Sequence, residues 1–204
     1  MPMETETHRG ILVIACGALA REIATLRRVN RWTALDVRCL PAELHNRPER
    51  IAPAVRAEIR AHLDRYRTIF VAYGDCGTAG ALDAVLEAEG VERLQGAHCY
   101  QFFAGPQAFD QLCEAEPGTF YLTDFLLRHF DRLVIRGLGL DRHPELTPMY
   151  FQHYRKLVYL AQARVPAEAV ERAKQIAQRM GFTFEHRFTG YGELGTRLGA
   201  LVAS

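Results

Sequence analysis

The sequence predicts an α/β protein in which a mostly parallel β-sheet carries helices on both faces, a Rossmann-like arrangement. Three observations predict this class. Short apolar runs alternate with segments of helical periodicity along the first half of the chain. The runs are almost continuously apolar, which is typical of strands buried on both faces. A Gly or Pro ends each of the first three runs, and such β-α-β alternation gives parallel strands joined by right-handed crossovers.

The first strand is ILVIACG, residues 11–17, and apolar Leu19, Ile23 and Leu26 recur after it at helical spacing. The other elements expected in this half are strands at 35–40, 68–74 and 91–96, and helices at 51–66 and 80–90. Pro53 is expected to delay the start of the helix at 51–66, because proline fits only the first turn.

The second half is less regular and contains a helical insertion before a C-terminal βαβ unit. We expect a helix near 106–116, a strand followed by an amphipathic helix over 118–135, a strand at 155–162, a helix at 166–181, a strand at 182–190 and a final helix at 191–202. Residues 1–10 are expected to be a flexible leader, and 11–204 a single domain. The alternative is two α/β lobes, about 11–117 and 118–204.

Composition limits the classes of function. The chain has 204 residues and a net charge of +1, which argues against binding to a phosphate backbone, since that needs a basic excess. No apolar stretch is long enough to span a membrane. The five cysteines are an odd number without an export signal, so we expect reduced thiols in a cytoplasmic protein. The predicted partners are therefore a small-molecule ligand or another protein, and the length also suits a homodimer.

The carboxyl ends of parallel strands meet along one edge of the sheet, where such folds bind their ligands. Cysteine and histidine follow several of the predicted strands at that edge. Thiolate and imidazole groups bind zinc or iron, and a catalytic site needs three of them. The metal ligands that we predict from this convergence are Cys16, His45, Cys76, His98 and Cys99. Packing is the alternative for each cysteine, because no CxxC or HExxH motif is present.

Other residues of the edge are candidates for cofactor binding. Gly17, Gly74 and Gly77 allow close approach of the backbone to a ligand, and Tyr100 could stack on a planar one if it is exposed. The helix starts after CGALARE and GDCGTAG are compatible with an anion, but neither matches a nucleotide-binding motif.

The remaining candidates have weaker arguments. Asp75, Asp124 and Glu43 are candidate acid–base groups, but no spacing identifies a catalytic pair. For Cys39 the preferred interpretation is packing, and Cys113 is assigned to the interior of a helix.

Several segments together resemble the family called domain of unknown function 1638: IACGALARE, CLPAELHNRPE, VAYGDCGT, GAHCYQFFAG, GTFYLTDFL, GLDRHPEL and TGYG. The resemblance runs from about residue 11 to the end. It implies a setting beside corrinoid proteins, methyltransferases of the trimethylamine and glycine-betaine type, and tetrahydrofolate-linked partners. The corrinoid-binding motif DxHxxG is absent, since 141–146 lacks its glycine, so the chain is not expected to be the corrinoid carrier.

Two main hypotheses follow. The first is a protein that binds zinc or iron through Cys and His and serves corrinoid-dependent methyl transfer in one-carbon metabolism, with folate or corrinoid supplied through a partner. If it is an enzyme, a zinc- or iron-dependent methyltransferase-type activity is expected. The second is a non-catalytic accessory partner of a methyltransferase or corrinoid protein, with structural cysteines only. A thiol redox protein is a third and weaker hypothesis.

Overall fold

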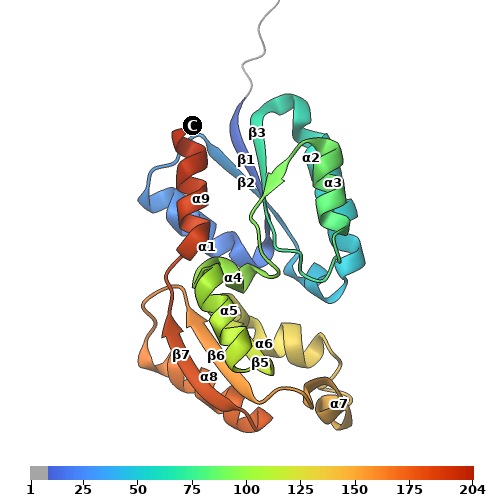
Figure 1. Cartoon of the computed structure of the whole chain (residues 1–204), viewed down its shortest axis with the longest axis vertical. Coiled ribbons are helices and arrows are strands. Elements are labelled where there is room, and N and C mark those ends of the chain that lie inside the picture. Colours follow the sequence, from blue (N-terminus) through green and yellow to red (C-terminus); the bar gives the residue numbers. More distant parts are fainter. Residues whose placement is uncertain (1–8) are drawn as a thin grey trace, which may run out of the picture. The chain divides into compact units, whose positions relative to one another are not determined.

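The structure is a computed structural model that describes residues 9–204 (Figure 1). Most of the predicted leader, residues 1–8, lies outside the described residues, while Arg9 and Gly10 already belong to the first strand. The chain forms two compact units. Unit 1 is the described chain up to Ala97 together with Gly195–Ser204, and unit 2 is His98–Leu194.

Unit 1 contains a four-stranded parallel sheet of order β2-β1-β3-β4. Its strands are β1 Arg9–Cys16, β2 Leu35–Leu40, β3 Tyr66–Ala72 and the short β4 Glu92–Arg93. Its helices are α1 Ala20–Val29, α2 Ile51–His62 and α3 Ala81–Glu89, joined by most of α9 Gly192–Ala203.

The helices of unit 1 cover both faces of its sheet, as predicted. In Figure 1, α1 and α9 lie on one face and α2 and α3 on the other. This follows from right-handed crossovers, because the chain first moves from β1 to one neighbour and then across to the other. The central strand β1 is consequently buried on both sides, with Leu12, Val13, Ile14 and Ala15 fully shielded from solvent.

Unit 2 contains a three-stranded parallel sheet of order β5-β6-β7. Its strands are β5 Thr119–Thr123, β6 Lys156–Ala161 and β7 Thr183–Phe188. Its helices are α4 Cys99–Ala104, α5 Pro106–Ala115, α6 Asp124–Phe130, α7 Thr147–Phe151 and α8 Ala167–Met180. The predicted C-terminal βαβ unit is confirmed as β6-α8-β7.

Side chains of β6 alternate between two cores, as the period of a strand requires. Leu157 and Tyr159 pack into a cluster with α6 and α8, whereas Val158 and Leu160 pack with Phe109 of α5. Helices thus cover both faces of this sheet as well. The packing of α5 on β6 explains why unit 2 begins at residue 98, before the boundary near 117 that the two-lobe alternative proposed.

Two local predictions differ from the structure. Helix α2 begins at Ile51, so Pro53 does not delay its start; it lies in the first turn, where its missing N–H needs no partner. Strand β4 ends at Arg93, and His98–Tyr100 do not follow a strand directly but open α4.

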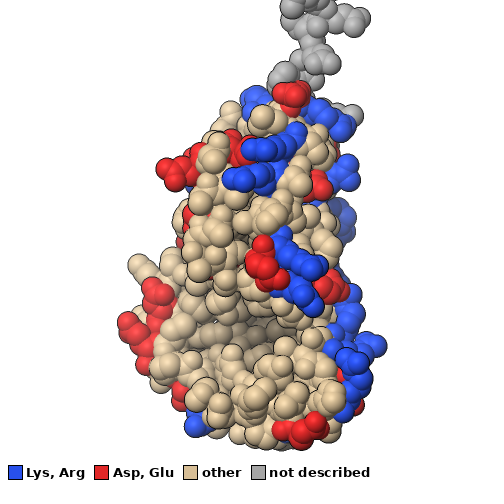
Figure 2. Space-filling model, turned by 90° about the vertical axis from the view of Figure 1, so that its right-hand side faces the viewer, with Lys and Arg blue, Asp and Glu red and all other residues tan. Residues whose placement is uncertain are grey.

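Neither the surface charge nor the apolar character of the helices identifies a class of partner. Basic groups are interspersed with acidic ones and with neutral surface on the face shown in Figure 2. Within residues 9–204, no helix combines the length and the apolar character that crossing a bilayer requires.

Candidate functional site

The sheet of unit 1 reverses its strand order between β1 and β3. From β1 the chain passes through α1 to β2 on one side, and then through α2 to β3 on the other side. The loops that follow β1 and β3 therefore diverge onto opposite faces, and open α/β sheets bind ligands at such a point. Cys16 ends β1 there, and Tyr73 directly follows β3.

Tyr73 is the least satisfied polar group at this point. Its side chain is 2% exposed, and among residues 9–204 its hydroxyl finds no hydrogen-bond partner of ordinary geometry. Burial raises the pKa of Tyr73, and the neighbouring thiols of Cys16, Cys76 and Cys39 raise it further. A thiol is a weak acceptor and compensates little for the lost hydration of a phenol. Tyr73 therefore presents a neutral hydroxyl whose neighbour for hydrogen bonding is the weakly accepting thiol of Cys16.

Cys16 lies beside this hydroxyl and is buried as well. Burial raises the pKa of the Cys16 thiol, while the Ala18 N–H and the Tyr73 hydroxyl act in the opposite direction. Because burial is the largest effect, Cys16 is a neutral thiol at neutral pH. A neutral buried thiol is a poor nucleophile, so this residue is suited to contact a ligand and not to attack one.

Cys76 belongs to the loop between β3 and α3. Its backbone has a φ of 49°, in the left-handed region that side chains other than Gly, Asn and Asp rarely adopt. Its N–H donates to the Ala97 carbonyl at 2.7 Å, and the Asp75 N–H donates to the Gly96 carbonyl at 2.9 Å. The thiol of Cys76 is buried. Strain of this kind concentrates at functional sites and is held by such bonds.

Asp75 organises the same loop. Its carboxylate accepts hydrogen bonds from the Thr78 hydroxyl at 2.7 Å and from the Gly80, Gly77 and Ala79 N–H groups at 3.0 to 3.2 Å. These donors, the Gly80 N–H first, hold the pKa of Asp75 below its usual value. The N–H groups that were expected to suit an anion before α3 thus already bind an anion of the chain itself. Asp75 is ionised at neutral pH and acts as a cap, not as an acid.

The structure gives local reasons for two predicted cofactor-binding glycines. A Cβ at Gly17 would approach the Leu40 carbonyl oxygen to 2.8 Å, so this glycine permits close contact with the end of β2. Gly77 has a φ of 84° and therefore needs the freedom of glycine. Gly74 is buried in the same loop. Ligand contact by these three residues stays a prediction.

The remaining predicted residues of unit 1 lie nearer to solvent. His45 is exposed within a short 3₁₀ segment, Ala42–Asn46. Cys39 is exposed on the edge strand β2, so the interpretation that it packs in the core is wrong. The alternation of LDVRCL could not reveal this, because it does not say which face a neighbouring element covers.

The three other predicted site residues, His98, Cys99 and Tyr100, belong to unit 2, and the two aromatic ones take part in a row of stacked rings. The His98 ring stacks on Tyr100 with centroids 4.8 Å apart, and Tyr100 stacks on Tyr121 at 5.0 Å. Cys99 opens α4 and is half-buried. Cys113 lies within α5, as predicted, with its sulfur 3.5 Å from the Tyr121 hydroxyl.

The predicted metal ligands are thus divided between the two units, with Cys16, His45 and Cys76 in unit 1 and His98 and Cys99 in unit 2. Within the described part of the chain, no three His, Cys, Asp or Glu side chains are arranged to hold a metal ion. Of the predicted ligands at the edge of unit 1, the Cys16 thiol is protonated at neutral pH and Cys76 is buried. Binding of zinc or iron by these residues stays a prediction.

Unit 2 has its own polar group where β5 and β6 end. The buried Asp124 carboxylate accepts the Tyr159 hydroxyl at 2.7 Å and the N–H groups of Gln162 and Ala163 at 3.2 and 3.0 Å. The Asp124 N–H in turn donates to the Gln162 side-chain oxygen at 2.8 Å. Burial, and then the hydrogen bond to Asp124, raises the pKa of Tyr159. This network holds β5 and β6 together, and each of its members has a partner.

Comparison with known proteins decides the family. A family model described as a protein of unknown function (DUF1638) matches residues 39–198, most of the chain. The chain belongs to the DUF1638 family. The resemblance seen in the sequence motifs is thereby confirmed, although the match begins at 39 and Cys16 lies before it. No curated protein and no solved structure matches the DUF1638 chain.

Two residues of this DUF1638 protein were missed by the sequence analysis. Tyr73 stands directly after a predicted strand and could have been listed with its neighbours by the same positional argument. Tyr159 lies inside a strand, where a tyrosine usually signals packing, and only the pairing of β5 with β6 brings it to Asp124.

Removing the hydroxyl from each of the two buried tyrosines should have opposite effects on stability. Tyr73→Phe deletes a buried hydroxyl without a partner, so we expect the free energy of unfolding to rise by about 1 kcal/mol. Tyr159→Phe, the matched control, removes one hydrogen-bond donor from the buried Asp124 carboxylate. It should lower the free energy of unfolding by about 1.5–3 kcal/mol. Urea unfolding at neutral pH measures both. Equal destabilisation by the two changes would contradict our account of Tyr73.

Asp75→Asn should destabilise the protein in a pH-dependent way. At neutral pH we expect a loss of about 1 kcal/mol, because the amide NH₂ of Asn would replace one of the two oxygens that accept the hydrogen bonds of the loop. Since the folded pKa of Asp75 is depressed, its contribution is complete above the unfolded value of about 3.9 and disappears as the pH falls through the folded value. Urea unfolding between neutral and acid pH, with exposed Asp110→Asn as control, tests this. A difference from wild type that is independent of pH would refute it.

Proposed function

We propose that this DUF1638 protein binds a small molecule at the carboxyl edge of unit 1 and serves corrinoid-dependent methyl transfer as a partner of a corrinoid protein or methyltransferase. The observation that carries the proposal is the buried, unsatisfied hydroxyl of Tyr73, set between the ends of β1 and β3 beside the Cys16 thiol. A buried polar group without a partner costs about 1–3 kcal/mol. A ligand that accepts or donates one hydrogen bond there would remove that cost.

The same surroundings restrict the chemistry of the ligand. Cys16 and Tyr73 are neutral, and Asp75 already occupies the N–H groups that precede α3. No uncompensated positive charge among these groups calls for an anion. The ligand group in contact with them is therefore expected to be neutral, with a hydrogen-bonding atom for Tyr73 and a polarizable or apolar surface for the thiols. A pterin ring or the rim of a corrinoid has such atoms.

The methyl-transfer setting rests on the family resemblance, and a cytoplasmic location belongs to the same proposal. Cys16, Cys39 and Cys113 are free thiols, which suits a reducing compartment. Accessory binding, not catalysis, is favoured by the raised pKa of Cys16, since a nucleophilic thiol would need the reverse.

A zinc or iron site that combines two of the predicted ligands, Cys16 and Cys76, with Cys39 is a separate candidate, and one observation supports it. Three thiols, those of Cys16, Cys39 and Cys76, all act on the Tyr73 hydroxyl. Ligation would require them to lose their protons and move together, so any affinity should fall as the pH is lowered.

Calorimetric titration of untagged protein with tetrahydrofolate and with hydroxocobalamin tests the proposal. We expect saturable binding of at least one of them, weakened about tenfold or more in Tyr73→Phe, because one hydrogen bond is lost while the fold is kept. Asp110→Asn, an exposed substitution in unit 2, should bind like wild type. Absence of binding by both compounds would contradict the proposed function. Elemental analysis that finds an equivalent of zinc or iron, lost in Cys16→Ala, would favour the metal candidate instead.

A further inference from the structure

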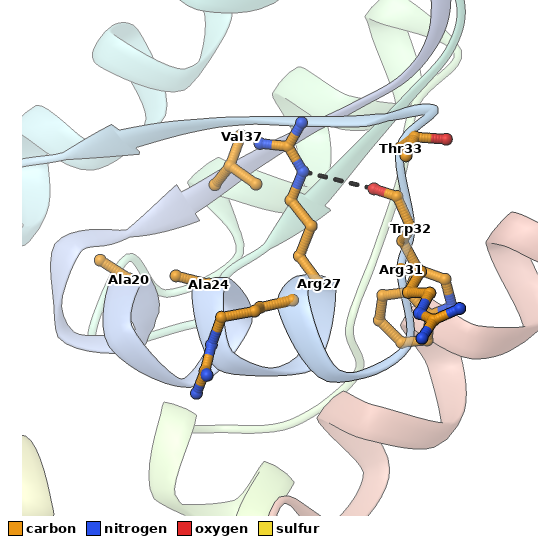
Figure 3. Close-up of a pocket in the computed structure, with 8 residues that line it drawn as sticks. Ala20, Ala24, Arg27, Arg31, Trp32, Thr33 and Val37 are labelled. Atoms are coloured by element: carbon orange, nitrogen blue, oxygen red, sulfur yellow. Dashed lines mark hydrogen bonds between the residues drawn. The ribbon is translucent and has the colours of Figure 1, made fainter.

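A hollow in unit 1 lies away from the carboxyl edge of the sheet, between α1 and β2. It has a volume of about 610 Å³, which is within the range of small-molecule sites. Its apolar part includes Ala24 of α1 and Val37 of β2, whose small side chains leave the space open. Its wall is completed by Arg28 and by Arg27, Arg31 and Trp32, which are labelled in Figure 3. A pocket with an apolar floor and three guanidinium groups suits an amphipathic anion.

The three arginines have different roles. Arg27 pairs with Asp36 at 3.5 Å and donates to the Trp32 carbonyl at 3.3 Å, drawn as a dashed line in Figure 3. Its guanidinium is thus committed to holding α1 against β2. Arg28 and Arg31 are exposed and form no ion pair with other described residues. Their charges are available to a ligand.

The backbone at Arg31 gives an independent indication. The Trp32 N–H bonds to the Arg27 carbonyl at 3.0 Å and the Arg31 N–H to the Arg28 carbonyl at 3.4 Å, which is the Schellman pattern at the end of a helix. Arg31 occupies the left-handed position of this motif with a φ of 56°, where glycine is usual and other side chains are strained. Arg27 and Arg28 lie in the last turn of α1 and already place positive charge at its carboxyl end, where the helix dipole favours it. A role for the Arg31 side chain in binding would explain why the strain is kept.

We propose that this α1–β2 pocket binds a small organic anion, a phosphomonoester or carboxylate joined to a short apolar body. The oxyanion is held by the guanidinium groups of Arg28 and Arg31, which match its geometry with paired hydrogen bonds. The apolar body lies on Ala24 and Val37. This proposal is independent of the function proposed for the carboxyl edge of the sheet.

Trp32 is the only tryptophan of the chain, so its fluorescence reports on this pocket directly. Hexyl phosphate and hexanoate are the probes, with hexanol and inorganic phosphate as the two half-ligands. We expect a saturable change of Trp32 emission with at least one probe, at a Kd on the order of 1 mM. The affinity should fall as the ionic strength rises. Hexanol and inorganic phosphate should each bind about tenfold more weakly or not at all. Comparable binding of hexanol, or no saturable change with either probe, would overturn the proposal.

Substitutions can distinguish the effect of losing an arginine charge from the effect of disturbing the fold. Arg28→Gln and Arg31→Gln should each weaken binding of the probe about tenfold, whereas Arg38→Gln, on the opposite face of β2, should bind like wild type. Arg31→Gly should lose affinity in the same way while its melting temperature rises by about 2–4 °C, since glycine relieves the backbone strain. If Arg38→Gln lost as much affinity, the probe would be attracted by the positive charge of the surface in general. That result would refute the site.

Discussion

The reversal of strand order between β1 and β3 is the constraint on which the account of this protein depends. Parallel strands with right-handed crossovers must send α1 to one face of the sheet and α2 to the other. The chain therefore leaves β1 and β3 in opposite directions, and the residues at their ends face each other without a connecting loop between them. Cys16 and Tyr73 are neighbours for this reason, although more than fifty residues separate them in the sequence.

Two polar groups at strand ends of this protein are satisfied in different ways, whereas the Tyr73 hydroxyl is not. Asp75 supplies a carboxylate to the N–H groups of its own loop. Asp124 is shared between β5 and β6, where Tyr159 and Gln162 complete its hydrogen bonds. Tyr73 has no such arrangement among the described residues. The ligand that we propose would supply the hydrogen bond that Tyr73 lacks.

Backbone strain occurs at the proposed α1–β2 pocket as well as in the loop after β3. Arg31 stands where the backbone favours glycine, and Cys76 has a left-handed backbone in the loop after β3. In both places a residue other than glycine occupies a position that reduces stability, and hydrogen bonds of the surrounding backbone hold it there. Substitutions to glycine at such positions can therefore stabilise a protein while removing its binding.

Much of the fold could be predicted, because periodicity is local. The apolar run 11–17 and the segment 35–40 became β1 and β2, and the βαβ unit at the C-terminus formed as expected. The convergence of Cys16 and Cys76 on one edge also followed from parallel topology alone. The exposure of Cys39 and the partner of Asp124 did not, because both depend on which elements lie beside a strand. The assignment of His98 and Cys99 to unit 2 likewise depends on the packing of α4 and α5.

A double-mutant cycle between Cys16 and Tyr73 tests the central claim most directly. The free energy of unfolding would be measured in urea for wild type, Cys16→Ala, Tyr73→Phe and the double variant. Contact between the two side chains at the strand-order reversal predicts a coupling energy of about 0.5–1.5 kcal/mol, whereas residues that are far apart add within about 0.3–0.5 kcal/mol. Additive effects would show that the ends of β1 and β3 do not form one site, and would contradict the account.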